Sequence, residues 1–267
     1  MGKNEPIGIF DSGVGGLTVV KSLMEKMPDE SFIYFGDTAH VPYGNKSEQQ
    51  LFNYAHKIIS FLISKQVKAI IVACGTHSSV TLPSVLQEYS LPMLGVVKAG
   101  ARSAARLSRN GKIGVAATQA TVNKKAYTRE IQELEPEFQV YETACPRFVP
   151  LVEAGKLNNS ESREAVAEYL GPLLAQGIDT LVLGCTHYPF LATAISEFAG
   201  EKLELVDTSC ETIDELQEIF GAQDLFNNSG EKPRHEFYVS GHDDSFFNVG
   251  RLLMGDIIKE IHKLDWD

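Results

Sequence analysis

The sequence has few basic residues, few cysteines and no long apolar run, and each shortage excludes a class of protein. Its 24 lysines and arginines are outnumbered by 35 aspartates and glutamates, and the formal net charge is −11. Because nucleic-acid binding depends on basic patches that neutralise phosphates, no nucleic-acid partner is expected. No apolar run approaches the roughly 18 residues needed to span a bilayer, so no membrane association is expected.

The four cysteines include no Cys-x-x-Cys pair; they are Cys74, Cys145, Cys185 and Cys210. A structural zinc site is therefore not expected, and no spacing of metal ligands is recognisable elsewhere. The first apolar strand is under way by Ile7, which leaves no room for a signal peptide, so we expect a cytoplasmic protein. Cysteines in that compartment are usually thiols, and Cys145 and Cys210 fit the role of small packing residues.

The order of predicted elements indicates the fold class. Strands alternate with helices along the 267 residues, which is typical of parallel sheets covered by helices on both faces. The pattern starts afresh near Lys98, with no Pro/Gly/Ser-rich linker. We therefore predict an α/β protein of two similar domains, each a mainly parallel sheet flanked by helices, facing each other in a pseudo-twofold arrangement. The predicted domains are residues 1–97 with 208–267, and residues 98–207.

Several helix boundaries follow from breakers and caps. Apolar spacing predicts helices that include those over about residues 79–88, 99–108, 121–134 and 245–264. A capping box of Ser47 and Gln50 opens a further helix.

The stretch around Cys74 combines a buried strand with a reactive side chain. The apolar run over residues 69–73 is typical of a strand buried on both faces. Cys74 follows it, Gly75 permits a sharp turn, and a helix comes next. The residues that can cap this helix are Thr76, Ser78 and Ser79. Open α/β sheets bind ligands at this edge, and a helix N-terminus lowers the pKa of a thiol, so we expect Cys74 to be reactive.

The same construction recurs around Cys185, after an apolar run over residues 178–183. Pro189 suits the first position of the next helix. A threonine and a histidine closely follow each cysteine, so we interpret the two stretches as half-sites of one centre. Two thiols on opposite faces of one carbon can remove a proton from one side and return one to the other. That reaction is a racemisation, and it requires no cofactor.

A third strand end carries Asp11-Ser12-Gly13, followed by two more glycines. Its backbone N–H groups suit an anion, although the loop lacks the lysine of a P-loop and the G-x-G-x-x-G pattern of a dinucleotide site. Each candidate also has a purely structural interpretation. Either cysteine can be a buried packing residue, Asp11 a helix cap, and His187 or Glu153 a surface or capping residue. His77 can assist Cys74 as His187 can assist Cys185.

Taken together, these motifs resemble the glutamate racemases of the aspartate/glutamate racemase superfamily. The motifs, in order, are Asp11-Ser12-Gly13-x-Gly15-Gly16, Asp37-Thr38, Pro42-Tyr43-Gly44, Cys74-x-Thr76 and Gly184-Cys185-Thr186-His187-Tyr188-Pro189. The resemblance extends from Ile7 to about Phe220. It implies interconversion of L- and D-glutamate without metal or pyridoxal phosphate, for peptidoglycan synthesis. A homodimer is also expected.

The resemblance also implies roles for single residues. Cys74 would deprotonate the D enantiomer and Cys185 the L enantiomer, with Asp11, His187 and Glu153 as helpers. The implied substrate-binding residues are Asp11, Ser12, Pro42, Tyr43, Gly44, Gly75, Thr76, Thr118, Thr121, Thr186 and His187. Where the family usually reads Cys-Asn-Thr-Ala-Ser, this sequence has Cys74-Gly75-Thr76-His77-Ser78. Gly75 therefore offers only its backbone N–H.

Two other functions stay open on the sequence. An aspartate or hydantoin racemase would use the same scaffold and the same pair of thiols. A binding protein for an acidic amino acid would need the polar loops, but it would have no use for two matched cysteines.

Removing the α-proton leaves a carbanion beside a carboxylate, and oriented N–H and hydroxyl donors must stabilise that charge. Three strand-end turns supply such donors.

Overall fold

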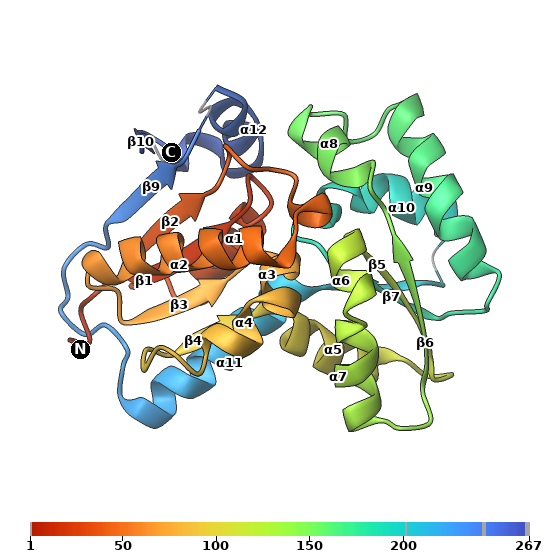
Figure 1. Cartoon of the computed structure of the whole chain (residues 1–267), viewed down its shortest axis with the longest axis horizontal. Helices are drawn as coiled ribbons and strands as arrows, with labels where there is room; N and C mark the ends of the chain where they lie inside the picture. The colour runs from red at the N-terminus through yellow and green to blue at the C-terminus, as the bar shows by residue number, and fades with distance from the viewer. Residues whose placement is uncertain (1, 201, 242–243, 265–267) are drawn as a thin grey trace.

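The structure, a computed structural model, describes residues 2–200, 202–241 and 244–264. Every strand pair described is parallel, and the strands form two sheets (Figure 1). The strand orders are β10-β9-β2-β1-β3-β4 in the six-stranded sheet and β6-β5-β7-β8 in the four-stranded sheet. The predicted fold class, two parallel sheets flanked by helices, is confirmed.

The strands of the six-stranded sheet come from both ends of the chain. They are β1 (Ile7–Asp11), β2 (Phe32–Gly36), β3 (Ala69–Val72), β4 (Met93–Gly95), β9 (His235–Val239) and β10 (His262–Lys263). The middle of the chain forms the other sheet, with β5 (Lys112–Ala117), β6 (Gln139–Ala144), β7 (Thr180–Leu183) and β8 (Glu204–Asp207). These sets agree with the segments assigned to the two domains, and the boundaries at 97/98 and 207/208 stay a prediction.

Helices cover both faces of each sheet, because successive side chains of a strand point to opposite faces. In β1, Ile9 packs with helices on one face and Phe10 with helices on the other. The first face holds α1 (Leu17–Lys26), α11 (Thr208–Gln223) and α12 (Asp244–Met254); the second holds α2 (Glu48–Ser64) and α4 (Leu82–Val85). The four-stranded sheet lies between α5 (Val96–Leu107) with α7 (Ala126–Leu134), and α8 (Phe148–Glu153), α9 (Ser160–Leu174) and α10 (Ala192–Ala199).

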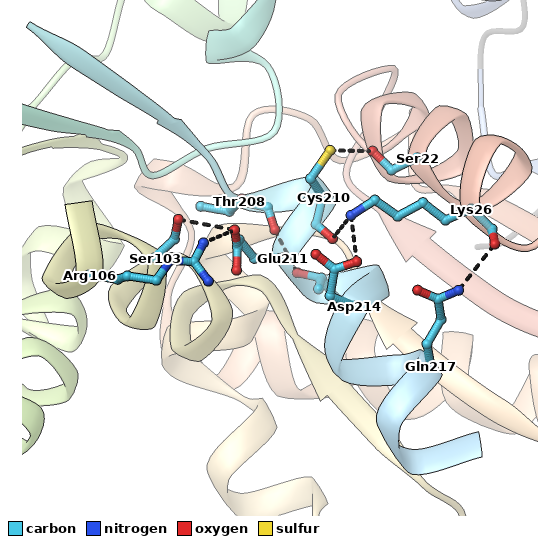
Figure 2. Close-up of polar contacts among 10 residues, drawn as sticks. Ser22, Lys26, Ser103, Arg106, Thr208, Cys210, Glu211, Asp214 and Gln217 are labelled. Atoms are coloured by element: carbon cyan, nitrogen blue, oxygen red, sulfur yellow. Dashed lines mark hydrogen bonds and ion pairs between the residues drawn. The ribbon is translucent and has the colours of Figure 1, made fainter. Parts of the chain in front are cut away.

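Helix α11 carries the chain back from the smaller sheet to the larger one, and it is tied to both halves (Figure 2). On one side, Lys26 of α1 donates to the carbonyl of Cys210 at 3.2 Å and pairs with Asp214 at 2.5 Å. On the other side, Glu211 accepts from Arg106 of α5 at 2.7 Å and from Ser103 at 3.2 Å. Residues 210 and 214 lie one turn apart on one face, so α11 presents a separate polar face to each half.

Four predicted helices differ from the structure. The helix expected over 79–88 begins earlier, as α3 (Gly75–Val80), and α4 follows. The helix expected at 99 begins at Val96. The one expected over 121–134 is split into α6 (Gln119–Asn123) and α7, because Lys125 between them has a left-handed φ of 47°. The C-terminal helix stops at Met254, and Gly255, with φ 64°, turns the chain toward β10.

Among the residues that the structure describes, no helix is both long and apolar enough to cross a membrane.

Candidate active site

One cavity of about 160 Å³ lies where strand-end loops of both sheets meet. The predicted site residues that line it are Asp11, Ser12, Pro42, Tyr43, Gly44, Cys74, Thr76, Thr118, Cys185 and Thr186. Cys74 follows β3 of the larger sheet, and Cys185 follows β7 of the smaller sheet. The two thiols are therefore brought to one cavity from two different sheets, as the paired half-sites predicted.

Cys74 is itself the N-cap of α3, so the expectation that Thr76, Ser78 or Ser79 caps this helix was wrong. Its sulfur accepts hydrogen bonds from the backbone N–H groups of His77 and Thr76, and these bonds favour the thiolate. Burial outweighs them, and with the nearby Asp11 it raises the pKa of Cys74 well above its ordinary value. The expected lowering of that pKa was also wrong, because burial favours the protonated thiol.

Cys185 faces a charged partner instead. Its sulfur lies 3.7 Å from Nδ1 of His187, and Nε2 of the same ring lies 2.7 Å from Oε1 of Glu153. Burial lowers the pKa of His187, but the contacts with Cys185 and Glu153 outweigh burial and raise it well above its ordinary value. Burial raises the pKa of Glu153, and His187 reverses that shift so that the net change is downward. The imidazolium of His187 therefore lies between the carboxylate of Glu153 and the sulfur of Cys185.

The glycine-rich loop after β1 contacts Glu153 across the gap between the sheets. The backbone N–H of Val14 donates to Oε1 of Glu153 at 3.2 Å. A side chain at Gly13 would overlap Glu153, and one at Gly15 would overlap His187. The loop was expected to offer its N–H groups to an anion. The N–H of Val14 does so, and the anion it binds is the carboxylate of Glu153 in the same chain.

Asp11 connects the two halves at the cavity wall. Its side chain is fully buried, and it accepts hydrogen bonds from the N–H of Gly13 at 3.1 Å and from the hydroxyl of Thr186 at 3.1 Å. Burial raises its pKa, while the positive charge of His187 and these hydrogen bonds oppose the shift. Asp11 also raises the pKa of Cys74, so its charge acts on the first thiol, and its helper role stays a prediction.

A buried carboxylate holds the Pro42-Tyr43-Gly44 loop against the cavity. Asp37 is 1% exposed, and it accepts hydrogen bonds from the hydroxyl of Tyr43 and from the hydroxyl of Ser240, the latter at 2.5 Å. Nδ1 of His40 lies 2.8 Å from the same carboxylate. Asp37 therefore fixes Tyr43 by accepting a hydrogen bond from the phenolic hydroxyl of Tyr43. Gly44 follows in a 3₁₀ turn over Tyr43–Asn45.

Four hydroxyl groups join α3 to the loop after β5. Thr76 and Thr118 share a hydrogen bond of 2.9 Å, Thr118 and Thr121 one of 3.0 Å, and Ser79 donates to Thr121 at 3.2 Å. Thr118 caps α6 by accepting from the N–H of Thr121. This chain crosses from the larger sheet to the smaller one, so it ties both halves together beneath the cavity.

Some predicted site residues lie behind the cavity wall and not on it. His187 contacts Cys185 and Glu153 contacts His187, Thr121 shares a hydrogen bond with Thr118, and Gly75 opens the helix after Cys74. The lining residues that the sequence analysis missed are Asn45, Gln119, Cys145, Pro146, Val149 and Tyr188. Cys145 and Pro146 come directly after β6, so their place at a sheet edge was the signal available.

His77 does not take the role suggested for it beside Cys74. Its Nδ1 lies 3.0 Å from the Thr81 hydroxyl, and its ring meets those of Phe10 and Tyr43 edge to face. Burial lowers its pKa to about 3, so the ring is neutral at physiological pH. In the described part of the chain its only side-chain hydrogen bond is the one to Thr81, and His77 packs beneath Tyr43.

Comparisons with known proteins place the chain in a family. A family model described as Asp/Glu/Hydantoin racemase matches residues 18–215. A glutamate racemase of Geobacter metallireducens is 42% identical over 97% of this chain and 96% of its own. The structure of a glutamate racemase from Francisella tularensis with D-glutamate has a TM-score of 0.91 at 35% identity, covering 98% of each chain. One from Bacillus anthracis has a TM-score of 0.93 at 34% identity, covering 99% of this chain and 98% of that one. This chain belongs to the Asp/Glu/hydantoin racemase family.

Proposed function

We propose that this protein is a cofactor-independent racemase that interconverts L- and D-glutamate. The observation that carries the proposal is the cavity with one thiol from each sheet, Cys74 and Cys185. A second observation supports it: the relatives that match almost the whole chain are glutamate racemases. We also propose that the protein supplies D-glutamate for peptidoglycan, is located in the cytoplasm and forms a homodimer. Light scattering on the purified protein tests the homodimer.

The proposed mechanism follows from the different surroundings of the two thiols. The imidazolium of His187 lies beside the sulfur of Cys185 and stabilises negative charge there. The raised pKa of Cys74 keeps that thiol protonated. These different surroundings suit Cys185 to the role of base and Cys74 to the role of acid toward L-glutamate. Cys185 would take the α-proton of L-glutamate, and Cys74 would deliver its proton to the opposite face of the same carbon. D-glutamate would use the same groups in reverse.

Stabilising the carbanion is the second task of the site. Removing the α-proton places negative charge on the α-carboxylate, and donors aimed at that charge lower the barrier. Ser12, Thr76, Thr118 and Thr186 line the cavity from both halves, and the hydroxyl of Thr186 donates to Asp11. We propose that they bind the substrate together with the Pro42-Tyr43-Gly44 turn. Since the protein carries a net charge of −11, these local donors must offset the repulsion of an acidic substrate.

A deuterium experiment tests the proposed mechanism. A single base could return the same proton to the other face, whereas two thiols must deliver a proton drawn from solvent. In deuterated water, D-glutamate formed early from L-glutamate should carry deuterium at the α-position, and unreacted L-glutamate should carry almost none. Proton NMR of each enantiomer measures this. Early product that keeps its original α-hydrogen would exclude the two-thiol mechanism.

The same assay separates the alternatives. An aspartate or hydantoin racemase would leave glutamate unchanged and racemise its own substrate from a small panel of amino acids and hydantoins. A binding protein would bind glutamate with no exchange of the α-hydrogen in deuterated water. We expect glutamate to be the acidic amino acid that is turned over fastest.

Replacing Glu153 with glutamine should move the alkaline limb of the pH profile. Glu153 helps to raise the pKa of His187, so the imidazolium is present at neutral pH and is lost as the pH rises through that raised pKa. Without the carboxylate this pKa falls, and kcat for L-glutamate should decline at a lower pH than in the wild-type enzyme. The measurement is kcat against pH for both proteins. A limb that stays in place, or moves to higher pH, would contradict this role for Glu153.

A further inference from the structure

The two thiol-bearing turns touch at a point where neither has a side chain. Gly75 opens α3 directly after Cys74, and Gly184 lies between the end of β7 and Cys185. A Cβ built on Gly75 would lie 2.5 Å from the carbonyl oxygen of Gly184 and 3.7 Å from Cα of Cys185. Side-chain Cβ atoms do not approach a backbone atom to 2.5 Å, so the two backbones are closer than any residue other than glycine at position 75 allows.

Hydrogen bonds hold each of the two turns in its place. The N–H of Gly184 donates to the carbonyl of Ala116 at 2.8 Å, and a Cβ there would lie 2.9 Å both from that oxygen and from the ring of Tyr127. On the opposite side, α3 is tied to the smaller sheet by the hydrogen bond between Thr76 and Thr118. The contact between Gly75 and Gly184 is therefore held from both sides.

We propose that Gly75 is a positioning residue that sets the gap between the two thiols; this inference rests on the proposed racemase function. Each cysteine is the chain neighbour of one of the touching glycines, so the separation of the two turns determines the separation of the two sulfurs. The related motif usually carries asparagine at position 75, and this backbone has no space for its Cβ. The chain has a direct backbone contact in the place where such a side chain would stand.

A Gly75→Ala variant tests the inference through activity. The added methyl group must push the two turns apart, which widens the gap between Cys74 and Cys185. Displacing reacting groups by about 1 Å can cost about 10²-fold in rate, so kcat should fall by about that factor in both directions. The matched control is Gly171→Ala in α9, where nothing lies within 4 Å of the added atom. This control should keep the wild-type kcat.

The rate at which iodoacetamide alkylates each cysteine measures access to the gap between Cys74 and Cys185 without depending on turnover. In the wild-type protein Cys74 and Cys185 are 5% and 6% exposed, and Cys145 is fully buried. Gly75→Ala should be alkylated faster at Cys74 and Cys185, as measured by peptide mass spectrometry with the exposed Cys210 as the rate reference. Gly171→Ala should match the wild type at all four.

Each outcome decides the inference. Wild-type kcat in Gly75→Ala would overturn it. So would a fall in kcat without faster alkylation at Cys74 and Cys185, because the gap would then be unchanged. If the wild-type chain does not racemise glutamate, that result overturns the proposed function, and the alkylation comparison still tests the gap.

Discussion

Replacing either Cys74 or Cys185 with alanine should abolish racemisation of glutamate in both directions. Each direction needs one thiolate to take a proton and one thiol to supply another, so the loss of either group stops both. Removal of a single general acid or base typically costs about 10²–10⁴-fold in rate, and a fall in kcat of at least that size is expected for each variant. Circular dichroism of the enantiomers over time measures it.

The two variants should differ in what they still do. Cys74→Ala keeps the base assigned to L-glutamate, so it should exchange the α-hydrogen of L-glutamate with deuterated water while leaving D-glutamate unchanged. Cys185→Ala should show the reverse preference. The exposed Cys210 provides the matched control, because its sulfur lies outside the cavity and shares a hydrogen bond of 3.6 Å with the hydroxyl of Ser22. Cys210→Ala should racemise normally, and near-normal turnover by Cys74→Ala would refute the assignment.

The place of the two cysteines could be predicted because the signal was local. Each follows a short apolar run that ends in a turn, and side chains after parallel strands gather at one edge of a sheet. The structure brings Cys74 and Cys185 to one cavity for that reason. The same rule applied to Cys145 and Pro146 after β6 would have found two more lining residues.

The protonation of the site could not be predicted, because it depends on contacts between distant segments. The helix start beside Cys74 acts as expected and favours the thiolate, but burial has the larger effect. The pKa of His187 rises through its neighbour Cys185 and also through Glu153, a partner 34 residues away in sequence. The spacing of the motifs predicts neither the depth at which Cys74 is buried nor the contact between His187 and Glu153.

Helix ends were predicted poorly where the backbone conformation is unusual. Lys125 splits one expected helix with a left-handed φ of 47°, and its sequence context of consecutive lysines carries no breaker. The late strand β10 replaces the end of another expected helix, and its pairing with β9 is a long-range contact that apolar spacing does not reveal.

At the opposite ends of the strands, a Glu30→Gln substitution should strongly destabilise the protein. Lys68 precedes β3, and its ammonium group lies 2.6 Å from Glu30, with side-chain exposures of 0% and 3%. It also donates to the carbonyls of Lys3 and Leu225, at 2.5 Å and 2.9 Å. Removing one partner of a buried ion pair leaves the other charge unpaired, which typically costs about 3–5 kcal/mol in the free energy of unfolding.

Urea unfolding of Glu30→Gln and of a surface control measures this cost. The control is Glu197→Gln, which removes an exposed ion pair of 3.1 Å with Arg163 and should change stability by about 1 kcal/mol or less. Adding Lys68→Met to Glu30→Gln should recover much of the lost stability, because the unpaired ammonium is then gone. Folded Glu30→Gln should keep its kcat, since Lys68 and the cavity lie at opposite ends of β3. If Glu30→Gln and Glu197→Gln have equal free energies of unfolding, the buried pair contributes no more to stability than the exposed pair, and the prediction is wrong.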